Sequence, residues 1–476
     1  MKKKVLATLL ASSMIVGMLA GCGSSEPAED TAADTSTTTE EKAEEPAEEK
    51  AEEPADEAAD DGETITVKML TILGNPTRDQ LVQDILAENL DANIKVEIIS
   101  PPADQSRQKM ITMLQAKEDI DIIELGTLVM TDYINNEWCA PLDDYIAEWD
   151  EYETISASLR EQAASYDGHV YGIGNGQYQK ALFYRKDWLE EAGLEVPTTW
   201  DEFYEVAKAL TDPAQNRYGY ALRAGSGGSP FLDNHLRCEL GSDYISLAMP
   251  NITNERKSIF EYQEAVDVAN YWIKLYQDTA NPDCLAWGYP ETVEAFYSGT
   301  AALLIQDPEV IATCEQYMEE GTWGVAPIPT GKSGESWNNA GVGAWGIANH
   351  SEKKDAAWEV IKALSGAAGN VAWCKANGNL PVQTTASEDP YYGEGYYAAY
   401  SVMGNEPDTY KWYADAGETL WMTKEELDLQ NGYTEGDLKF QELLLGAITP
   451  EQYCEYRAQY HAWAHDSEWL KEVYPD

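Results

Sequence analysis

Three carboxylates stand where the chain could meet a small molecule: Glu124, Asp307 and Glu309. Carboxylate oxygens can accept hydrogen bonds from pairs of sugar hydroxyls. The same groups could equally hold a cationic solute such as a polyamine, through attraction between opposite charges. These residues therefore leave two classes of ligand open, a carbohydrate and a small cation.

The aromatic residues favour the first class. The chain has 29 Tyr and 15 Trp residues but only 6 Phe. Tyr and Trp rings can stack on the apolar faces of sugars, while their O–H and N–H groups reach hydroxyls. We therefore expect a carbohydrate-like solute between aromatic faces, with a few carboxylates and amides fixing its orientation. The tryptophans in or beside predicted loops or strand ends are the expected contacts, namely Trp287, Trp337, Trp345, Trp412 and Trp421.

Sequence motifs for catalysis are missing. The chain contains neither GxSxG nor HExxH, and its five histidines offer no triad. His461 and His465 are spaced i, i+4, but no carboxylate or cysteine stands at motif spacing, so we predict a surface pair rather than a metal site. In so acidic a chain, two carboxylates at the separation found in glycosidases would occur by chance. We expect no enzyme, no metal and no cofactor; a cell-surface carbohydrate-active enzyme and a scaffold or adhesin are distant alternatives.

The elements that must position these residues alternate between strand and helix patterns. Strands are predicted at 63–73, 95–99 and 121–125, and helices at 78–90 and 105–115. This alternation is typical of an α/β protein whose parallel sheet has helices on both faces. Such sheets bind ligands beyond the carboxyl ends of their strands, which points to Asn75, Glu124 and Thr127.

A glycine-rich loop follows a further strand pattern at 218–222. The loop spans residues 223–229 and begins with Arg223. It lacks the GxxxxGK[ST] spacing of a phosphate-binding loop. We therefore predict a flexible loop on the binding face, with Arg223 as a ligand contact, rather than a nucleotide site.

The first 63 residues have a different composition from the rest. Three lysines precede an apolar run at residues 5–20, which is too short for a comfortable membrane span. The run ends in Leu-Ala-Gly-Cys, which resembles a bacterial lipobox and implies cleavage of a signal peptide, residues 1–21, and lipidation of Cys22. An ordinary signal peptide is the alternative. Residues 23–63 are acidic and lack aromatic residues, which predicts a disordered tether, with an acidic interaction tail as the alternative.

The remaining residues, 64–476, are too many for one hydrophobic core, so two lobes are expected. The formal net charge of the whole chain, −52, argues against binding to nucleic acid, whose phosphates would be repelled. No stretch beyond residue 63 is apolar for long enough to span a bilayer. Scattered cysteine spacing predicts buried free thiols at Cys139, Cys238, Cys284, Cys314, Cys374 and Cys454.

Residues 171–203 read YGIGNGQYQKALFYRKDWLEEAGLEVPTTWDEF. A short apolar strand is followed by a helix that stops at Gly193, and Thr199 with Glu202 opens another helix. This order resembles the crossover of extracellular solute-binding proteins of ABC importers, of the carbohydrate type known as family 1. Further segments that resemble this family lie at 294–303, 323–329, 341–347, 351–364, 378–381 and 449–452. The resemblance spans about residues 64–455.

The resemblance implies a two-lobed fold of the type II periplasmic-binding-protein kind, each lobe a mostly parallel sheet flanked by helices. Lobe 1 would comprise 64–174 and 326–366, and lobe 2 would comprise 175–325 and 367–476. The lobes would close over a solute about hinges near residues 174–175 and 325–326.

The resemblance also implies partners and a location. The closed form would dock on the membrane subunits of an ABC permease, and the protein would be a monomer held by its lipid on the extracytoplasmic face of the cell membrane. Tyr178 falls where relatives place a ligand-contacting residue. Maltodextrin-binding relatives carry aromatic residues at the positions of Leu125 and Glu309, so a different or shorter sugar is expected here.

Overall fold

The computed structural model describes residues 64–71, 76–101, 106–126, 130–155, 159–160, 165–166, 168–385, 389–414 and 435–475. All of them belong to one compact unit, Gly62–Asp476. Cys22, Asn75, Thr127, Trp421 and the predicted signal peptide and tether lie outside the described residues. Within the described ranges, no helix has both the length and the apolar character needed to span a bilayer.

The larger of two main sheets has six strands. They are β1 (Ile65–Leu70), β2 (Ile94–Ile99), β3 (Ile122–Leu125), β6 (Ile173–Gln179), β11 (Ser336–Ile347) and β12 (Tyr410–Ala414). Their order is β12-β11-β3-β1-β2, and β6 also pairs with β11. β1 is parallel to β2 and β3, as the strand–helix–strand alternation predicted, whereas β11 is antiparallel to β3 and β6.

The smaller sheet is mixed. Its strands are β7 (Ala181–Arg185), β8 (Tyr218–Tyr220), β9 (Ala301–Gln306) and β10 (Trp323–Ala326), in the order β10-β7-β9-β8. β8 and β9 are parallel, but β7 is antiparallel to both β9 and β10. The mostly parallel pairing predicted for each lobe therefore does not hold in this sheet, because β7 runs opposite to both of its neighbours. A short hairpin of β4 (Ser165–Tyr166) and β5 (His169–Val170) lies apart from both sheets.

Helices cover the two sheets. In the first half of the chain they are α1 (Pro76–Asn89), α2 (Ser106–Gln115), α3 (Met130–Asn135), α4 (Asp143–Ile146), α6 (Lys186–Ala192), α7 (Trp200–Ala209) and α8 (Ser229–Leu240). They continue as α9 (Gln263–Thr279), α10 (Tyr289–Tyr297), α11 (Val310–Tyr317), α12 (Lys354–Ser365), α13 (Ala367–Asn377), α14 (Pro390–Gly393), α15 (Ala398–Asn405), α17 (Gly436–Leu444), α18 (Pro450–Ala458) and α19 (Glu468–Val473). Short 3₁₀ helices are η1 (Asp150–Thr154), η2 (Pro213–Gln215), η3 (Ile259–Glu261), η4 (Pro282–Ala286), η6 (Gly395–Tyr397) and η8 (Gln459–His465).

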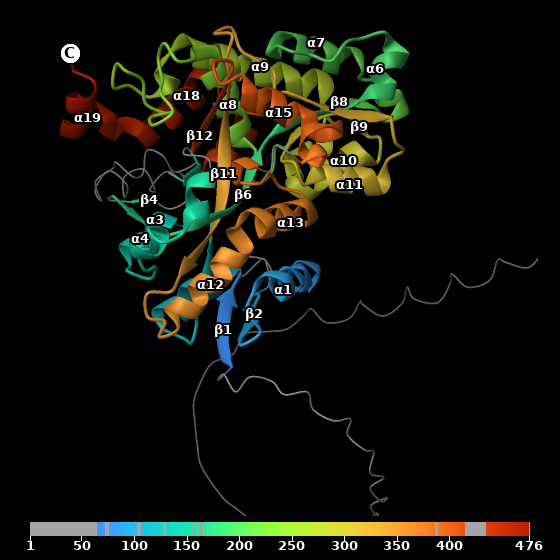
Figure 1. The fold of residues 1–476 in the computed structure, drawn as a ribbon. Coiled ribbons are helices and arrows are strands. Elements are labelled where there is room, and N and C mark those ends of the chain that lie inside the picture. The colour runs from blue at the N-terminus through green and yellow to red at the C-terminus, as the bar shows by residue number, and fades with distance from the viewer. Residues whose placement is uncertain are drawn as a thin grey trace, which may run out of the picture. The chain divides into compact units, whose positions relative to one another are not determined.

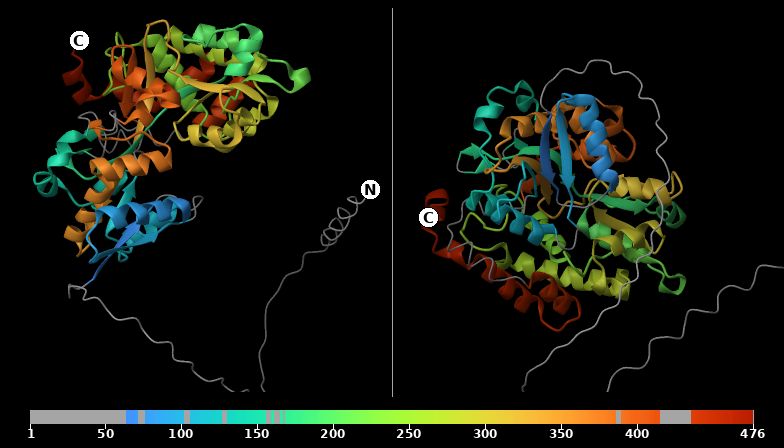
Figure 2. Two further views of the ribbon diagram at one scale, coloured as in Figure 1. Left: turned by 45° about the vertical axis from the view of Figure 1, so that its right-hand side comes forward. Right: turned by 90° about the horizontal axis from the view of Figure 1, so that it is seen from below.

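The helices divide between the sheets. α12 packs on β1, β6 and β11, and α13 packs on α1 and β6, whereas α10 packs on β9 (Figure 1). The left view of Figure 2 shows the blue β1–α1–β2 segment at one end of this unit and the green and yellow segments of the smaller sheet at the other. Together with the α/β composition, this grouping matches the predicted fold class.

Local signals at α6 and α7 act as predicted. Gly193 ends α6 with a left-handed backbone, at φ 66°. At the start of α7, Thr199 Oγ1 accepts a hydrogen bond from the Glu202 amide at 3.2 Å, and the Glu202 carboxylate accepts from the Thr199 amide at 3.3 Å. This capping box orients the first helix after the crossover between the sheets.

Two segments pass between the sheets. β6 is unbroken to Gln179, and Lys180 alone separates it from β7. The second segment, residues 327–335, joins β10 to β11. Compared with the predicted hinges at 174–175 and 325–326, the first crossing lies several residues further along, because β6 stays paired with β11 up to Gln179. The C-terminal strand β12 also lies in the larger sheet, through its pairing with β11.

All six cysteines among the described residues are buried and free, which confirms the thiol prediction. They are Cys139, Cys238, Cys284, Cys314, Cys374 and Cys454. Burial raises the pKa of each thiol, for example to about 12 at Cys139 and to about 11 at Cys238. Each thiol therefore packs as a small apolar group.

Candidate functional site

The carboxyl ends of β8 and β9 meet at one edge of the smaller sheet. The strands are parallel neighbours, with Tyr220 opposite Leu303. Arg223 follows β8 and Asp307 follows β9 directly, so the sheet brings a guanidinium and a carboxylate to the same edge. Burial lowers the pKa of Arg223, while the negative charges of Asp437 and Asp307 oppose that change. Two of the predicted ligand contacts therefore lie close together in a partly shielded position.

Glu309 has one hydrogen-bonded oxygen and one without a partner. Tyr289 donates its hydroxyl to Oε1 at 3.1 Å, whereas Oε2 is shielded from solvent and meets no donor in the described part of the chain. Burial, together with the charge of Asp307, raises the pKa of Glu309 to about 8. At neutral pH the side chain is mostly protonated, so it can both donate and accept a hydrogen bond.

Lys180 links the larger sheet to these carboxylates. Its Nζ lies 3.6 Å from Asp307 Oδ1 and donates to Asn339 Oδ1 of β11 at 3.3 Å. The Lys180 and Asp307 side chains are only 13% and 20% exposed. The residue that separates β6 from β7 thus contacts polar groups from both sheets.

Tyr178 lies beside the same carboxylates. Its hydroxyl accepts a hydrogen bond from Asn377 Nδ2 at 3.3 Å, at the end of α13. The next residue, Gly378, has a positive φ of 80°, and a Cβ built on it would lie 2.8 Å from the Glu309 Cα. Only glycine fits such an approach without strain. The turn after α13 therefore contacts Tyr178 through Asn377 and Glu309 through Gly378.

We use the name site cluster for Tyr178, Lys180, Arg223, Asp307 and Glu309. Buried amides without partners also lie in this region. Asn379 is 0% exposed, and both of its polar side-chain atoms lack a hydrogen bond to any described residue. The Nε2 atom of Gln306, the last residue of β9, is buried without a partner too. Unpaired buried amides are costly, so each marks a position where a bound solute or water would be stabilising.

Three residues of this region are not singled out by the sequence: Lys180, Tyr289 and Asn379. The signal at Lys180 is a charged residue between two strand patterns, and the signal at Tyr289 is its position two residues after Trp287. Neither signal identifies a site by itself, because only the pairing of β6, β7 and β9 in the structure brings these residues together. Asn379 lies in the segment 378–381 that resembles the family, but that resemblance predicts a turn and not a ligand contact.

The glycine-rich loop after Arg223 is held in place. Gly227 and Ser229 donate their amides to the Asp437 carboxylate at 2.7 and 2.9 Å, and Arg223 Nε donates to the Ser226 carbonyl at 2.6 Å. Amides that already bind a carboxylate are not free to cradle a phosphate. These bonds also limit the flexibility predicted for the loop.

Trp287 is half-buried beside the glycine-rich loop. Its carbonyl accepts a hydrogen bond from the Gly225 amide at 2.9 Å. The structure therefore places Trp287 next to the loop that Arg223 begins, at the same edge of the smaller sheet. Trp287 is thus a predicted contact whose backbone lies beside the loop that Arg223 begins.

Two other predicted tryptophans lie in the core. Trp345 is 0% exposed and packs edge-on against Trp373 at a ring distance of 5.6 Å. Trp337 is 1% exposed, and its Nε1 donates to Glu335 at 2.7 Å. Glu124, a predicted ligand contact in the predicted strand 121–125, lies inside β3, buried and opposite Trp345. As placed, none of the three side chains forms an open surface for a solute, because the larger sheet and its helices enclose them.

Trp412 lies at a cavity of about 630 Å³. The same cavity is lined by Gln177 and Gln179 of β6. Side chains alternate along a strand, so Gln177 and Gln179 face away from the side on which Tyr178 meets the site cluster. Tyr400 lines the same cavity, and burial together with the charges of Asp307 and Glu309 raises its pKa, so the hollow at Trp412 borders the site cluster.

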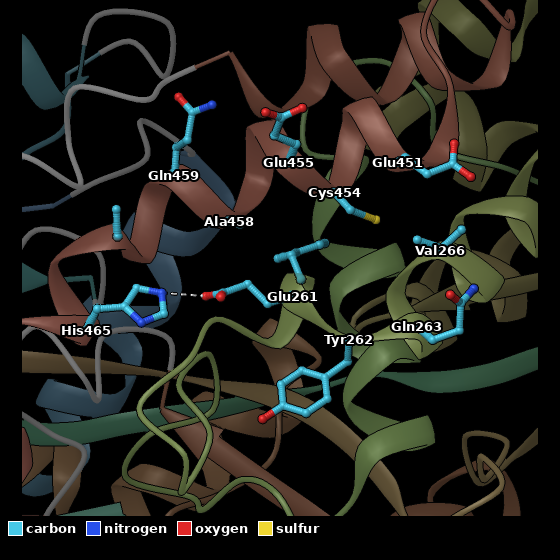
Figure 3. Close-up of a pocket in the computed structure, with 12 residues that line it drawn as sticks. Glu261, Tyr262, Gln263, Val266, Glu451, Cys454, Glu455, Ala458, Gln459 and His465 are labelled. Atoms are coloured by element: carbon cyan, nitrogen blue, oxygen red, sulfur yellow. Dashed lines mark hydrogen bonds and ion pairs between the residues drawn. The ribbon is translucent and has the colours of Figure 1, made fainter.

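The predicted histidine pair is not a surface pair. His461 is 4% exposed, with Nδ1 3.1 Å from Ser258 Oγ, and burial with nearby guanidinium groups lowers its pKa to about 3. His465 pairs instead with Glu261 at 3.0 Å, in an open groove of about 540 Å³ (Figure 3). Glu451 and Glu455 also line this groove. In the described ranges, no group of three or more His, Cys, Asp or Glu side chains is placed to hold a metal.

Comparison with protein families gives one match. A model of the family described as bacterial extracellular solute-binding protein matches residues 74–371, which is more than half of the chain. This range contains both crossings between the sheets and all five residues of the site cluster.

Curated relatives are distant. A putative binding protein of Brucella abortus is 22% identical over 330 residues, covering 69% of this chain and 78% of the relative. The mannitol-binding protein of Pseudomonas aeruginosa is 26% identical over 309 residues, covering 62% of this chain and 67% of the relative. The diacetylchitobiose-binding protein DasA of Streptomyces coelicolor is 27% identical, covering 67% and 73%.

Solved structures show the same fold. Maltose-bound MalE3 of T. maritima matches with a TM-score of 0.69 at 20% identity, covering 84% of this chain and 99% of the other. An ABC transporter solute-binding protein from Agrobacterium radiobacter with bound ribitol matches with a TM-score of 0.67 at 20% identity, covering 84% and 98%. At such low identity these matches establish the fold alone.

Proposed function

Because the chain belongs to the bacterial extracellular solute-binding proteins, we propose that it captures a neutral, hydroxyl-rich solute and delivers it to the membrane subunits of an ABC permease. The expected solutes are monosaccharides, oligosaccharides and polyols. The observation that carries the proposal is the site cluster, which draws aromatic, donor and acceptor groups from both sheets to one place. A few convergent polar groups of this kind fix the orientation of a small ligand.

Charge balance supports a neutral solute. Asp307 faces Lys180 at 3.6 Å and acts on the nearby Arg223, while Glu309 is mostly protonated at neutral pH because its pKa is raised to about 8. Little negative charge is then left over to hold a cation. The sugar and polyol ligands named for the Pseudomonas and Streptomyces relatives support the same class.

A polyamine is the second candidate. It is favoured by the adjacent carboxyl groups of Asp307 and Glu309 and by the hydroxyl of Tyr289, which contacts Glu309. Attraction between exposed or partly exposed charges is screened over about 8–10 Å at physiological salt. A polyamine would therefore bind much more weakly as salt rises, whereas a stacked and hydrogen-bonded sugar would not.

Capture is expected to proceed by closure of the two lobes. The solute is expected to contact Lys180 and Tyr178 on the crossover and Arg223 on the smaller sheet. Only the closed form brings these residues fully together. Such a ligand shifts the population toward closure by its differential affinity for that form. The closed form is the one that a permease would recognise.

We further propose that Cys22 carries a lipid and that residues 23–63 act as a tether. Stable anchoring needs more than one acyl chain, which a diacylglyceryl cysteine supplies. Changing Cys22→Ser should release the protein from membranes or block its processing. Normal processing and retention of that variant on membranes would show the anchor to be wrong.

The decisive experiment is a calorimetric screen of the full chain against mannitol, maltose, a chitin disaccharide and spermidine. We expect a sugar or polyol to bind, and Glu309→Leu to weaken its affinity about tenfold or more, since a side chain that both donates and accepts hydrogen bonds is lost. The control is Asp389→Asn, which alters a partly exposed carboxylate paired with Lys375. Tight binding of spermidine alone would refute the carbohydrate class, and turnover of a bound sugar would refute a pure binding role.

A further inference from the structure

The glycine-rich loop folds back over its own first residue, Arg223. Its Nε donates to the Ser226 carbonyl at 2.6 Å. Gly227 has a positive φ of 75°, and a Cβ built on it would lie 2.5 Å from Arg223 Nη2. A Cβ on Gly228 would lie 2.3 Å from the Arg223 carbonyl oxygen. Only glycine allows approaches this close, so the two glycines let the loop enclose the guanidinium.

The same glycines leave the next helix without a cap of its own. Gly228 stands at the N-cap of α8, where it has no side chain to accept from the amides of the first turn. Asp437 of α17 supplies the acceptors instead. Its two oxygens accept from the Gly227 amide at 2.7 Å and from the Ser229 amide at 2.9 Å. One carboxylate from the C-terminal part of the chain therefore holds the loop on both sides of Gly228.

A second residue of α17 holds the base of the loop. Gln441 lies four residues after Asp437, so both side chains lie on the same face of the helix. Gln441 Nε2 donates to the Ala224 carbonyl at 3.0 Å and to the Leu285 carbonyl at 3.1 Å. Leu285 belongs to the segment that leads to Tyr289. This helix therefore holds two of the segments that carry residues of the solute site.

The core anchors α17 itself. Phe440 is 0% exposed and packs edge-on against Trp272 at a ring distance of 5.7 Å, and Leu443 and Leu444 are buried beside it. The matched family range ends at residue 371, so α17 lies outside it. A helix fixed in this way is a rigid support for the loop that it holds.

We propose that Asp437 and Gln441 are positioning residues of the solute site, which act through Arg223. Ser226 occupies Nε of this arginine, and neither of its terminal nitrogens donates to a residue in the described ranges. By holding the loop, α17 directs these two nitrogens toward acceptor oxygens of a bound sugar or polyol. The identity of the solute rests on the proposed function, whereas the restraint on Arg223 does not.

The test is a double-mutant cycle on the full chain, titrated with mannitol and with maltose. Asp437→Asn keeps the size of the side chain but replaces one acceptor oxygen with a donor, so it cannot accept from both amides. It should weaken the sugar or polyol about fivefold or more. In the presence of Arg223→Gln, the same change should alter affinity less than about twofold, because the restraint acts through the arginine.

The matched control is Asp212→Asn, at the opposite end of β8. Asp212 also accepts from a backbone amide, that of Ala214 at 3.1 Å, so the variant loses the same kind of bond away from Arg223. Affinity should stay within about twofold. If Asp437 only caps α8, Asp437→Asn lowers the thermal midpoint and weakens binding equally with and without Arg223→Gln. That result would overturn the proposal.

A second measurement needs no solute. Phenylglyoxal modifies guanidinium groups, and mass spectrometry of the peptide that contains Arg223 gives the rate at this residue. Asp437→Asn should speed the modification about threefold or more, because the loop opens more often, whereas Asp212→Asn should not. An unchanged rate would overturn the positioning role. If no sugar or polyol binds the unaltered chain, the proposed function is wrong, and the modification rate alone decides whether α17 restrains Arg223.

Discussion

Asp233 and Glu309 are both acidic side chains withdrawn from solvent, but their oxygens have different partners. Arg457 donates from both terminal nitrogens to Asp233, at 2.9 and 2.6 Å, and the ring of Phe260 packs on its guanidinium at 4.6 Å. Burial alone would lower the pKa of Arg457, yet the charge of Asp233 outweighs burial and raises it. Glu309 has a hydroxyl on one oxygen and nothing from the described residues on the other.

The contrast distinguishes charged groups that stabilise the fold from charged groups that can bind a ligand. A bidentate pair satisfies both partners within the protein, so little is left to recognise a solute. A buried carboxyl with an unpaired oxygen is costly for folding and is tolerated where function requires it. We therefore expect changes at Asp233 to act on stability and changes at Glu309 to act on binding and pH dependence.

The largest effect should come from Asp233→Asn. Removing one partner of a buried ion pair leaves an uncompensated charge, which costs about 3–5 kcal/mol. Unfolding in urea, followed by tryptophan fluorescence, measures the loss. The control is Asp307→Asn, whose side chain is partly exposed and should cost under about 1 kcal/mol. Equal losses in the Asp233→Asn and Asp307→Asn variants would show that the buried ion pair matters no more to stability than the partly exposed one.

Glu309 should make stability depend on pH, and in a predictable direction. Its folded-state pKa, about 8, lies above the usual value of 4.5, so between these values the folded state holds a proton that the unfolded chain has released. The contribution of Glu309 to the free energy of unfolding is therefore fully present below pH 4.5 and is lost as the pH rises toward 8. Glu309→Gln should gain about 3–4 kcal/mol relative to the unaltered chain between pH 5 and pH 8.

Thermal denaturation across that pH range gives the comparison, with Asp389→Asn as the control for a partly exposed carboxylate. A constant difference between the Glu309→Gln variant and the unaltered chain would show that Glu309 titrates normally.

Lys180→Met should separate stability from binding at the crossover. Its ion pair with Asp307 is partly exposed, so the free energy of unfolding should change by about 0.5–1 kcal/mol. Solute affinity should fall by about fivefold, because the lysine is the donor that faces both sheets. Lys375→Met removes an exposed ion pair to Asp389 and serves as the control. Unchanged affinity in the Lys180 variant would place the solute elsewhere.

The smallest effect concerns salt. If Asp307 is neutralised by Lys180 and Glu309 carries a proton, the affinity for a sugar should change less than about twofold between 50 and 500 mM salt. Titrations at both concentrations measure this. A tenfold loss would indicate that unpaired charge holds the solute, as expected for the polyamine alternative.

The fold could be predicted from the sequence because its signals are local. The strand patterns at 95–99 and 121–125 correspond to β2 (Ile94–Ile99) and β3 (Ile122–Leu125) within one residue. The capping box at Thr199 needs only residues 199 to 202 to form. Such features depend on neighbours in the chain, so no tertiary information is required.

The site was less predictable because it depends on which elements pack together. Trp345 lies on a strand, and only the pairing with β3 and the contact with Trp373 decide that it is enclosed. Asp307 and Glu309 are neighbours in the sequence, but the shielding of Glu309 comes from Tyr289 and Gly378, which lie 20 and 69 residues away along the chain. Nothing in the sequence singles out Asp233, since its partner Arg457 is distant along the chain.

The six buried thiols have a consequence for handling and maturation. With no disulfide among the described residues, this part of the chain requires no oxidative pairing step to reach its native state. A thiol reacts with maleimide or iodoacetamide only when it is exposed and ionised. Burial prevents both exposure and ionisation of these six thiols. In a chain whose Cys22 is changed to Ser, labelling kinetics therefore report opening of the core directly, at six positions from Cys139 to Cys454.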